Sequence, residues 1–246
     1  MAGSTPNRIS GIIDCACVIH GTGYSWQYVE HLYHMLQRVF DTGIRFHVYT
    51  EAERPVPDHM IKHELTPWHG ADALIKSWWY KMQLFNAEHF SGNLLYLDLD
   101  VVVARELNFV RDCDPARLWA IRDFKYLQGR SNPTINSSVM WWNVSEFDWV
   151  WRQFCSENPA AVARRFPGDQ DYISHVVSVA QRRFFDDRYF ESYRWQCLDG
   201  GYDFRRRKYQ APGTGVRIAG DTAVVVFHGQ PKPHQVHDPE IVTLWC

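Results

Sequence analysis

Three short stretches of almost continuous apolar sequence predict buried strands in the first hundred residues. They are Ile12–Gly21 (IIDCACVIHG), Ile44–Thr50 (IRFHVYT) and Leu94–Leu99 (LLYLDL). Apolar runs of this length, with few alternating polar positions, are typical of strands that are covered on both faces. The three stretches are therefore predicted to lie in the interior of a sheet.

Segments with helical spacing separate these strands. From Trp26 to Phe40 the apolar residues recur at every third or fourth position, which predicts a helix with Ser25 as its cap. The Thr-Gly pair at 42–43 ends this helix. A second, longer helix is predicted from Ala71 to Phe90. The alternation of strands and helices predicts a parallel sheet with crossover helices.

The second half of the chain has a less regular pattern. Its predicted strands are 118–124, 136–144 and 222–229, its predicted helices are 147–157 and 169–180, and residues 55–67 of the first half are predicted to form an irregular connection. The sequence contains no convincing linker and no internal repeat. It therefore predicts one α/β domain over residues 1–246, with a nucleotide-binding half to about residue 110 and a half from about 111 that completes the cleft.

Composition and charge exclude some classes of protein. The chain has 246 residues and a formal net charge of −2, which gives no case for nucleic-acid binding. No apolar run of about 18 residues predicts a transmembrane helix, and the first ten residues lack the apolar core of a signal peptide. Six scattered cysteines without a CxxC pair favour a reduced, cytoplasmic protein. The basic run Arg205–Lys208 is either a solvated face or a contact with anionic lipid or an acidic saccharide, and a solvated face is the more common case.

Two aspartates, Asp98 and Asp100, follow the apolar run at 94–97. Ligands of open parallel sheets bind beyond the carboxyl ends of the strands, where these two residues are predicted to lie. In an extended chain residues two apart leave the same face, so the carboxylates would converge and repel each other. A divalent cation, Mn²⁺ or Mg²⁺, would remove that conflict, and it could then bind a diphosphate. The alternative is that both aspartates merely end a strand and cap a turn.

Lys81 falls on the apolar stripe of the predicted helix at 71–90. With 100° per residue, it lies near Trp78 and Phe85 on the face expected to meet the sheet. Its ammonium group either reaches the edge of the core, as buried lysines often do, or meets a phosphate or carboxylate beside the metal.

Three further segments carry candidate chemistry. In TINSSVMWWN, Asn136 and two serines precede an apolar strand, and small residues there allow a ligand to approach the backbone. In FPGDQDY, a turn is followed by Asp169-Gln170-Asp171 at the start of a helix, where aspartate is favoured. In VVVFHGQPKPH, His228 and Gly229 precede a lysine between two prolines, a plausible phosphate clamp with a possible metal ligand. The alternatives are an ordinary polar turn at Asn136 and a surface turn with a satisfied buried His228, whereas capping explains one aspartate of the DQD segment but not all three residues.

Taken together, these segments resemble the metal-dependent nucleotide-sugar glycosyltransferases of the GT-A fold. The closest likeness is to the family-eight group, which includes glycogenin and bacterial lipopolysaccharide galactosyl- and glucosyltransferases. The resemblance covers most of the chain, from the first strand to the HGQPKPH turn. It implies a GT-A type nucleotide-diphospho-sugar transferase fold of the α/β class, with a mixed, mostly parallel central sheet flanked by helices.

The resemblance also implies roles for the donor side of the site. LLYLDLDVVV matches the family's Asp-x-Asp strand, so Asp98 and Asp100 would bind Mn²⁺ or Mg²⁺ together with the donor diphosphate. YKMQLF matches a segment with a basic residue, so Lys81 would bind the donor. HGTGYSW occupies the position of the nucleotide-base site, which makes base-binding candidates of three residues, His20, Thr22 and Tyr24.

The later motifs imply the sugar pocket and the phosphate turn. NSSVM carries Ser138 where the family usually has glycine, and DQD matches a family motif, so the residues implied as catalytic are Asn136, Asp169 and Gln170. HGQPKPH resembles the motif His-x-x-Gly-x-x-Lys-Pro-Trp, with Gly229 and Lys232 aligned to its glycine and lysine. Val226 then stands at the usual metal-ligand position. His228, two residues later on the same strand face, is the substitute ligand.

The function implied is transfer of a hexosyl group from a nucleotide-diphosphate sugar, with UDP favoured, to a glycan or lipid-linked acceptor with retention. Such a role belongs to polysaccharide biosynthesis. Two alternatives stay open. A sugar nucleotidyltransferase shares the fold type but needs an Arg-containing Gly-rich loop that HGTGYSW lacks. A non-catalytic carbohydrate-binding protein would use the 11 tryptophans and would ignore nucleotide and Mn²⁺.

Overall fold

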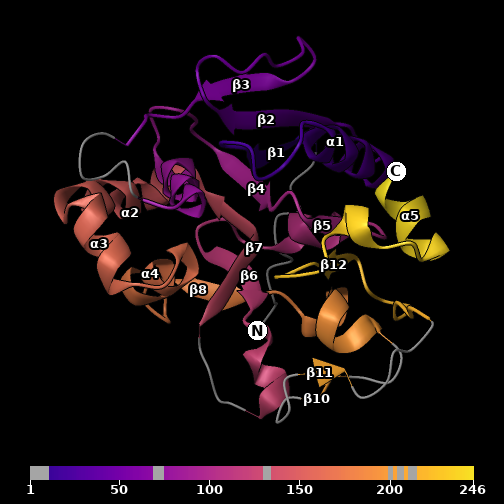
Figure 1. Cartoon of the computed structure of the whole chain (residues 1–246). Helices are drawn as coiled ribbons and strands as arrows, with labels where there is room; N and C mark the ends of the chain where they lie inside the picture. Colours follow the sequence, from indigo (N-terminus) through magenta and orange to yellow (C-terminus); the bar gives the residue numbers. More distant parts are fainter. Residues whose placement is uncertain (1–10, 69–74, 130–133, 199–201, 204–207, 210–214) are drawn as a thin grey trace, which may run out of the picture.

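A seven-stranded mixed sheet forms the centre of the molecule (Figure 1). The computed structural model describes residues 11–68, 75–129, 134–198 and 215–246, and the backbone of the short strands β10 (Tyr202–Asp203) and β11 (Lys208–Tyr209). The strand order is β3-β2-β1-β4-β7-β6-β8, and the bounds are β1 Ile13–Val18, β2 Ile44–Thr50, β3 Ile61–Glu64, β4 Asn93–Leu97, β6 Leu118–Arg122, β7 Ile135–Asn143 and β8 Arg182–Phe184.

Strand directions within this sheet confirm the mixed, mostly parallel architecture. The pairs β3–β2, β2–β1, β1–β4 and β6–β8 are parallel, whereas β7 runs antiparallel to both β4 and β6. The carboxyl ends of β1, β2 and β4 therefore meet at one edge, which is where an open sheet of this kind places its ligands.

Both faces of the inner strands are buried, as their continuous apolar sequences predict. In β4, Leu95 and Leu97 belong to one hydrophobic cluster and Leu94 and Tyr96 to another, and all four are at most 2% exposed. Successive side chains of a strand point to opposite faces, so the sheet has a core on each side. Truncating one of these leucines to alanine would cost roughly 2–5 kcal/mol.

Helices cover the two faces of the sheet. Helix α1 (Gln27–Val39) packs on one face with α5 (Pro239–Trp245), while α2 (Val144–Ser156), α3 (Pro159–Arg165) and α4 (Asp169–Val176) group on the other (Figure 1). A 3₁₀ helix, η2 (Ser77–Phe85), packs against α2 and α4. This second group presents the start of α4 and the buried face of η2 to the sheet.

A second sheet continues the chain from the end of β4. It has the order β5-β12-β9, formed by β5 (Val101–Val103), β12 (Val224–Val226) and β9 (Phe190–Ser192). The remaining short helical segments are η3 (Asn108–Asp112), η4 (Phe124–Gln128), η5 (Asp187–Tyr189), the π-helical η6 (Tyr193–Cys197) and η7 (Pro233–Gln235). Since β12 pairs with β5, the C-terminal turn returns to the residues that follow β4.

Several local predictions are wrong. Helix α1 begins at Gln27 with Trp26 as its N-cap residue and no side-chain cap hydrogen bond, so Ser25 does not cap it. The connection at 55–67 contains edge strand β3. The predicted helix at 71–90 is described only from residue 75, and there it is the 3₁₀ helix η2, which ends at Phe85. No helix among the described ranges is both long and apolar enough to cross a membrane. Most of the basic run 205–208 lies outside the described residues.

Candidate active site

A cavity of about 310 Å³ lies at the carboxyl ends of the parallel strands. Most of the residues singled out from the sequence line it, namely His20, Tyr24, Lys81, Asp98, Asp100, Asn136, Asp169, Gln170 and His228. Thr22 and Gly229 do not line it. Lys232 is also outside the lining, but its ammonium group contacts the Asp100 carboxylate. The fold thus brings together segments from both halves of the chain.

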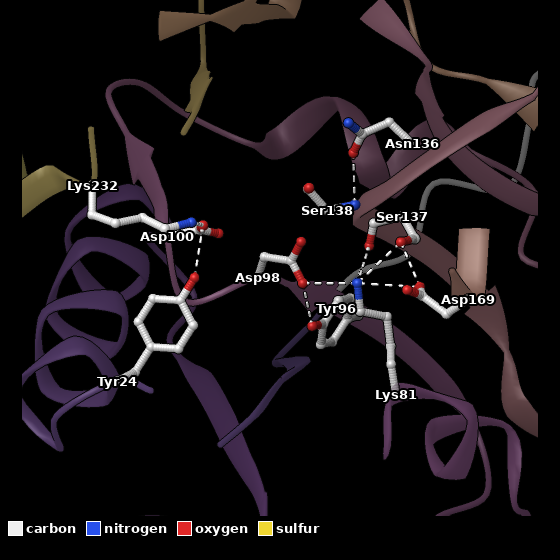
Figure 2. A network of polar contacts seen from close by, with 10 residues as sticks. All are labelled: Tyr24, Lys81, Tyr96, Asp98, Asp100, Asn136, Ser137, Ser138, Asp169 and Lys232. Carbon is white, nitrogen blue, oxygen red and sulfur yellow. Dashed lines mark hydrogen bonds and ion pairs between the residues drawn. The ribbon is translucent and has the colours of Figure 1, made fainter. Parts of the chain in front are cut away.

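The two aspartates lie on a turn rather than on an extended strand. Strand β4 ends at Leu97, Leu99 and Asp100 form a turn, and the chain then enters β5 of the second sheet. Figure 2 shows Asp98 beside Lys81, and Asp100 beside Tyr24 and Lys232. The expectation of an extended strand through both residues is therefore wrong, but both side chains still line the same cavity. Each carboxylate has its own lysine partner.

Lys81 is the centre of a buried polar network (Figure 2). Its Nζ lies 2.9 Å from Oδ1 of Asp98 and 3.3 Å from Oδ2 of Asp169, and it donates to Oγ of Ser137 at 3.0 Å. Burial alone would lower the pKa of Lys81, but attraction to the two carboxylates raises it above the ordinary value. Lys81 is therefore a permanent cation between a strand end and a helix start.

The same partners act on Asp98. Burial opposes ionisation, but the Lys81 charge and a hydrogen bond from the Tyr96 hydroxyl at 2.5 Å hold the pKa of Asp98 below its usual range. Its backbone N–H donates to the Ser138 carbonyl at 2.8 Å, which ties the end of β4 to β7. Asp98 is thus ionised and fixed in position.

Asp100 is in a different electrostatic environment. Burial and repulsion by Asp98 raise the pKa of Asp100, while Lys232 and Tyr24 oppose that rise. The Tyr24 hydroxyl donates to Oδ2 at 2.8 Å, and the Lys232 ammonium donates to the same oxygen. Because Lys232 comes from the C-terminal turn, this contact ties that turn to the residues that follow β4.

The DQD segment forms the opposite wall. Gly168 is the N-cap of α4, so Asp169 and Asp171 occupy its first turn instead of capping it. The Ser137 hydroxyl donates to Oδ2 of Asp169 at 2.6 Å, and Gln170 faces the cavity. On β7, Oδ1 of Asn136 accepts from the Ser138 N–H at 2.8 Å. These groups surround the space beside Asp98 with hydrogen-bonding atoms.

His228 has the chemistry of a metal ligand but contacts a serine. Burial, with repulsion from Arg194 and Lys232, lowers the pKa of His228 to about 4, so its ring is neutral near pH 7. Its Nε2 lies 2.6 Å from Oγ of Ser192. Two carboxylates and a neutral imidazole suit Mn²⁺. Within the described ranges, however, no group of three or more His, Cys, Asp or Glu side chains encloses a metal position.

The first loop contributes two of its three candidates to the cavity. His20 stacks on Tyr80 with ring centroids 3.9 Å apart, and burial lowers the pKa of His20. Tyr24 holds Asp100, whereas Thr22 is exposed on the loop. The role of these residues in binding a nucleobase stays a prediction.

Sequence reasoning missed the functional positions of Tyr96, Ser137 and Trp78. Tyr96 lies two residues before Asp98, and that spacing could have indicated that the two side chains meet. Ser137 was noted only as a small residue, although it bonds both Lys81 and Asp169. Trp78 was placed on the buried stripe but is 43% exposed. Trp78 is the second residue of η2 and precedes the buried run that begins at Trp79, so its place at the start of the helix leaves it exposed.

The chain is similar in fold to several solved glycosyltransferases. The galactosyltransferase LgtC, in complex with donor and acceptor sugar analogs, aligns at a TM-score of 0.64 and 15% identity over 95% of each chain. GlyE of Streptococcus pneumoniae TIGR4 aligns at 0.65 and 13% identity over 96% of this chain and 60% of that one. The bifunctional WbbM aligns at 0.53 and 12% identity over 92% and 47%.

At these identities the likeness defines the fold. The predicted GT-A type fold is confirmed. No protein-family model and no curated protein matches the sequence.

Proposed function

We propose that this protein is a glycosyltransferase that moves a hexosyl group from a nucleotide-diphosphate sugar, preferably UDP-linked, to a glycan or lipid-linked acceptor with retention. The main support is that the two carboxylates beyond β4 lie between two lysines in one cavity of a fold shared with glycosyltransferases. A second support is that LgtC was solved with donor and acceptor sugar analogs.

Lys232 would act on the diphosphate. In the present arrangement its ammonium is held by Asp100, which also accepts from Tyr24. A bound divalent cation, Mn²⁺ or Mg²⁺, would be held by Asp98 and Asp100, with His228 as a further ligand, and would supply positive charge to the diphosphate. Once Asp100 has another positive partner, Lys232 is free to donate to phosphate oxygens.

The sugar would lie between Asp98, Asp169, Gln170 and Asn136. The acceptor hydroxyl attacks the anomeric carbon from the face of the leaving group, and the bond from that carbon to the diphosphate oxygen breaks. The electron pair stays on the nucleoside diphosphate, and the hydroxyl proton passes to a phosphate oxygen. Lys81 holds Asp98 and Asp169 in place while positive charge develops on the ring, and the two carboxylates stabilise that charge.

Donor hydrolysis tests this function directly. Purified protein is incubated with UDP-galactose or UDP-glucose, with Mn²⁺ or with EDTA, and release of UDP is measured. We expect Mn²⁺-dependent release that Asp100→Ala abolishes and that Arg152→Ala, a surface change on α2, leaves unchanged. Full activity of Asp100→Ala would contradict the role of that carboxylate. Pyrophosphate release from UTP and a sugar 1-phosphate would instead identify a nucleotidyltransferase.

A further inference from the structure

A second groove of about 440 Å³ adjoins the active-site cavity. It runs between η2 and α3, and its walls include Lys76, Trp78, Arg164 and Arg165. Trp78 lines both the groove and the active-site cavity, so this side chain forms a wall of each space. A molecule bound in the groove would therefore lie next to the cavity in which sugar transfer is proposed.

The groove is positively charged. Three basic residues and no acidic residue of the described chain line it. Arg165 pairs with Glu157, whereas among the described residues no hydrogen bond or ion pair holds the Arg164 guanidinium. The active-site cavity has the opposite balance, since three aspartates line it with one lysine. The two neighbouring spaces are thus suited to ligands of different charge.

Trp78 supplies a flat apolar surface at the junction. It is 43% exposed, while its neighbour Trp79 is 2% exposed. Lys76 lies over the Trp78 ring, with its Nζ 4.7 Å from the centroid, and a Cβ on Gly168 would lie 3.9 Å from the indole Nε1. The indole ring therefore lies beside Gly168, the residue that precedes Asp169 and Gln170 in the chain. An exposed indole offers apolar contact to the C–H face of a sugar while charged groups beside it bind polar substituents.

We propose that this groove binds the acceptor, and that the acceptor is an anionic saccharide. A sugar ring stacks on Trp78, and its carboxylate or phosphate group is bound by Arg164 and Lys76. Guanidinium groups bind both kinds of anion through paired hydrogen bonds, so the shared chemistry is the negative charge. This assignment rests on the proposed glycosyltransferase function and adds the class of acceptor to it.

Arg164 is the residue of choice for the test because it lines the groove and not the active-site cavity. The variants are Arg164→Glu, Arg164→Gln and the control Arg152→Glu, which changes an arginine of α2 outside the groove lining. The probes are trigalacturonate, maltotriose 6-phosphate and neutral maltotriose. Binding of each is measured by calorimetry at about 50 mM salt, where electrostatic attraction is weakly screened.

We expect at least one anionic probe to bind about tenfold or more tightly than maltotriose. Arg164→Glu should weaken that binding by about tenfold, Arg164→Gln by less, and Arg152→Glu by less than about twofold. The two anionic probes show whether carboxylate or phosphate is preferred. Three results would overturn the assignment. They are that maltotriose binds as tightly as the anionic probes, that no probe binds, or that Arg164→Glu binds the anionic probes as tightly as the wild type does.

Nucleotide binding separates this result from the proposed function. UDP with Mn²⁺ is titrated into the wild type and into Arg164→Glu, and both should bind it equally. If UDP binds but the anionic saccharides do not, the groove assignment fails and the glycosyltransferase function stands. If the wild type does not bind UDP, the proposed function fails, and the acceptor assignment fails with it.

Discussion

Lys81 and Asp98 form a buried ion pair in which the ammonium nitrogen lies 2.9 Å from Oδ1 of the carboxylate. The lysine comes from η2 and the aspartate follows β4, so the pair joins a helix to the end of a central strand. Lys81 also reaches Asp169 at the start of α4. One cation therefore fixes the relative positions of three segments that line the cavity.

Lys81→Met is expected to destabilise the protein by roughly 3–5 kcal/mol, because it leaves buried carboxylates without a positive partner. The measurement is the free energy of unfolding in urea for Lys81→Met, Asp98→Asn and the double variant. The double variant should lose less stability than the two single losses added together. Strict additivity would show that the two side chains do not interact.

Ser137→Ala is expected to disturb the same network through hydrogen bonds. In the wild type the Ser137 hydroxyl accepts a hydrogen bond from Lys81 and donates one to Asp169, and both partners are buried. Removing the hydroxyl should therefore lower the free energy of unfolding by about 1–3 kcal/mol. Donor turnover should fall while UDP affinity changes little, because Asp169 contacts the sugar side in our proposal. Exposed Ser145→Ala serves as the control. Equal stability of the two variants would contradict this account of Ser137.

A histidine cluster away from the active site predicts a pH dependence of stability. Burial, with repulsion from His47 and His89, lowers the pKa of His63 from 6.5 to about 4. His63 stacks on Tyr49, and its Nε2 lies 2.8 Å from Nδ1 of His47, whose other nitrogen contacts Asp14. The folded protein therefore disfavours a proton on His63.

The sign follows from the two protonation states. Between pH 6.5 and 4 the unfolded chain binds more protons at His63 than the folded protein does. The contribution of His63 to the free energy of unfolding is therefore complete above pH 6.5 and is lost as the pH falls towards 4. The slope from this group is about 1.4 kcal/mol per pH unit. Urea unfolding of His63→Gln at several pH values should show a smaller loss than the wild type. The exposed His237→Gln should behave as the wild type, and an unchanged slope in His63→Gln would contradict the prediction.

The sequence predicted the central architecture because apolar periodicity and burial agree there. The runs at 13–18, 44–50 and 93–97 are strands whose two faces meet separate cores. The late strand at 224–226 was also anticipated. Edge strand β3 was missed because IKHE carries a mixed polar pattern and its pairing with β2 depends on tertiary contact.

The candidate site was predictable in its residues but not in their pairing. Local patterns indicated Asp98, Asp100 and Lys81, but no pattern shows that Lys232, from the last turn, reaches Asp100. That contact depends on the pairing of β12 with β5. The exposure of Trp78 was missed because this residue lies at the start of η2, before the buried run Trp79–Phe85, and the sequence pattern does not show where that burial begins.

The most direct test of the proposed function is a calorimetric titration of UDP, with and without Mn²⁺, into the wild type and Asp100→Asn. If Asp98 and Asp100 hold a cation against the nucleotide diphosphate, Mn²⁺ should tighten UDP binding to the wild type by about tenfold or more, and should do so far less in Asp100→Asn. Failure of UDP to bind the wild type, or equal tightening by Mn²⁺ in both proteins, would contradict that claim.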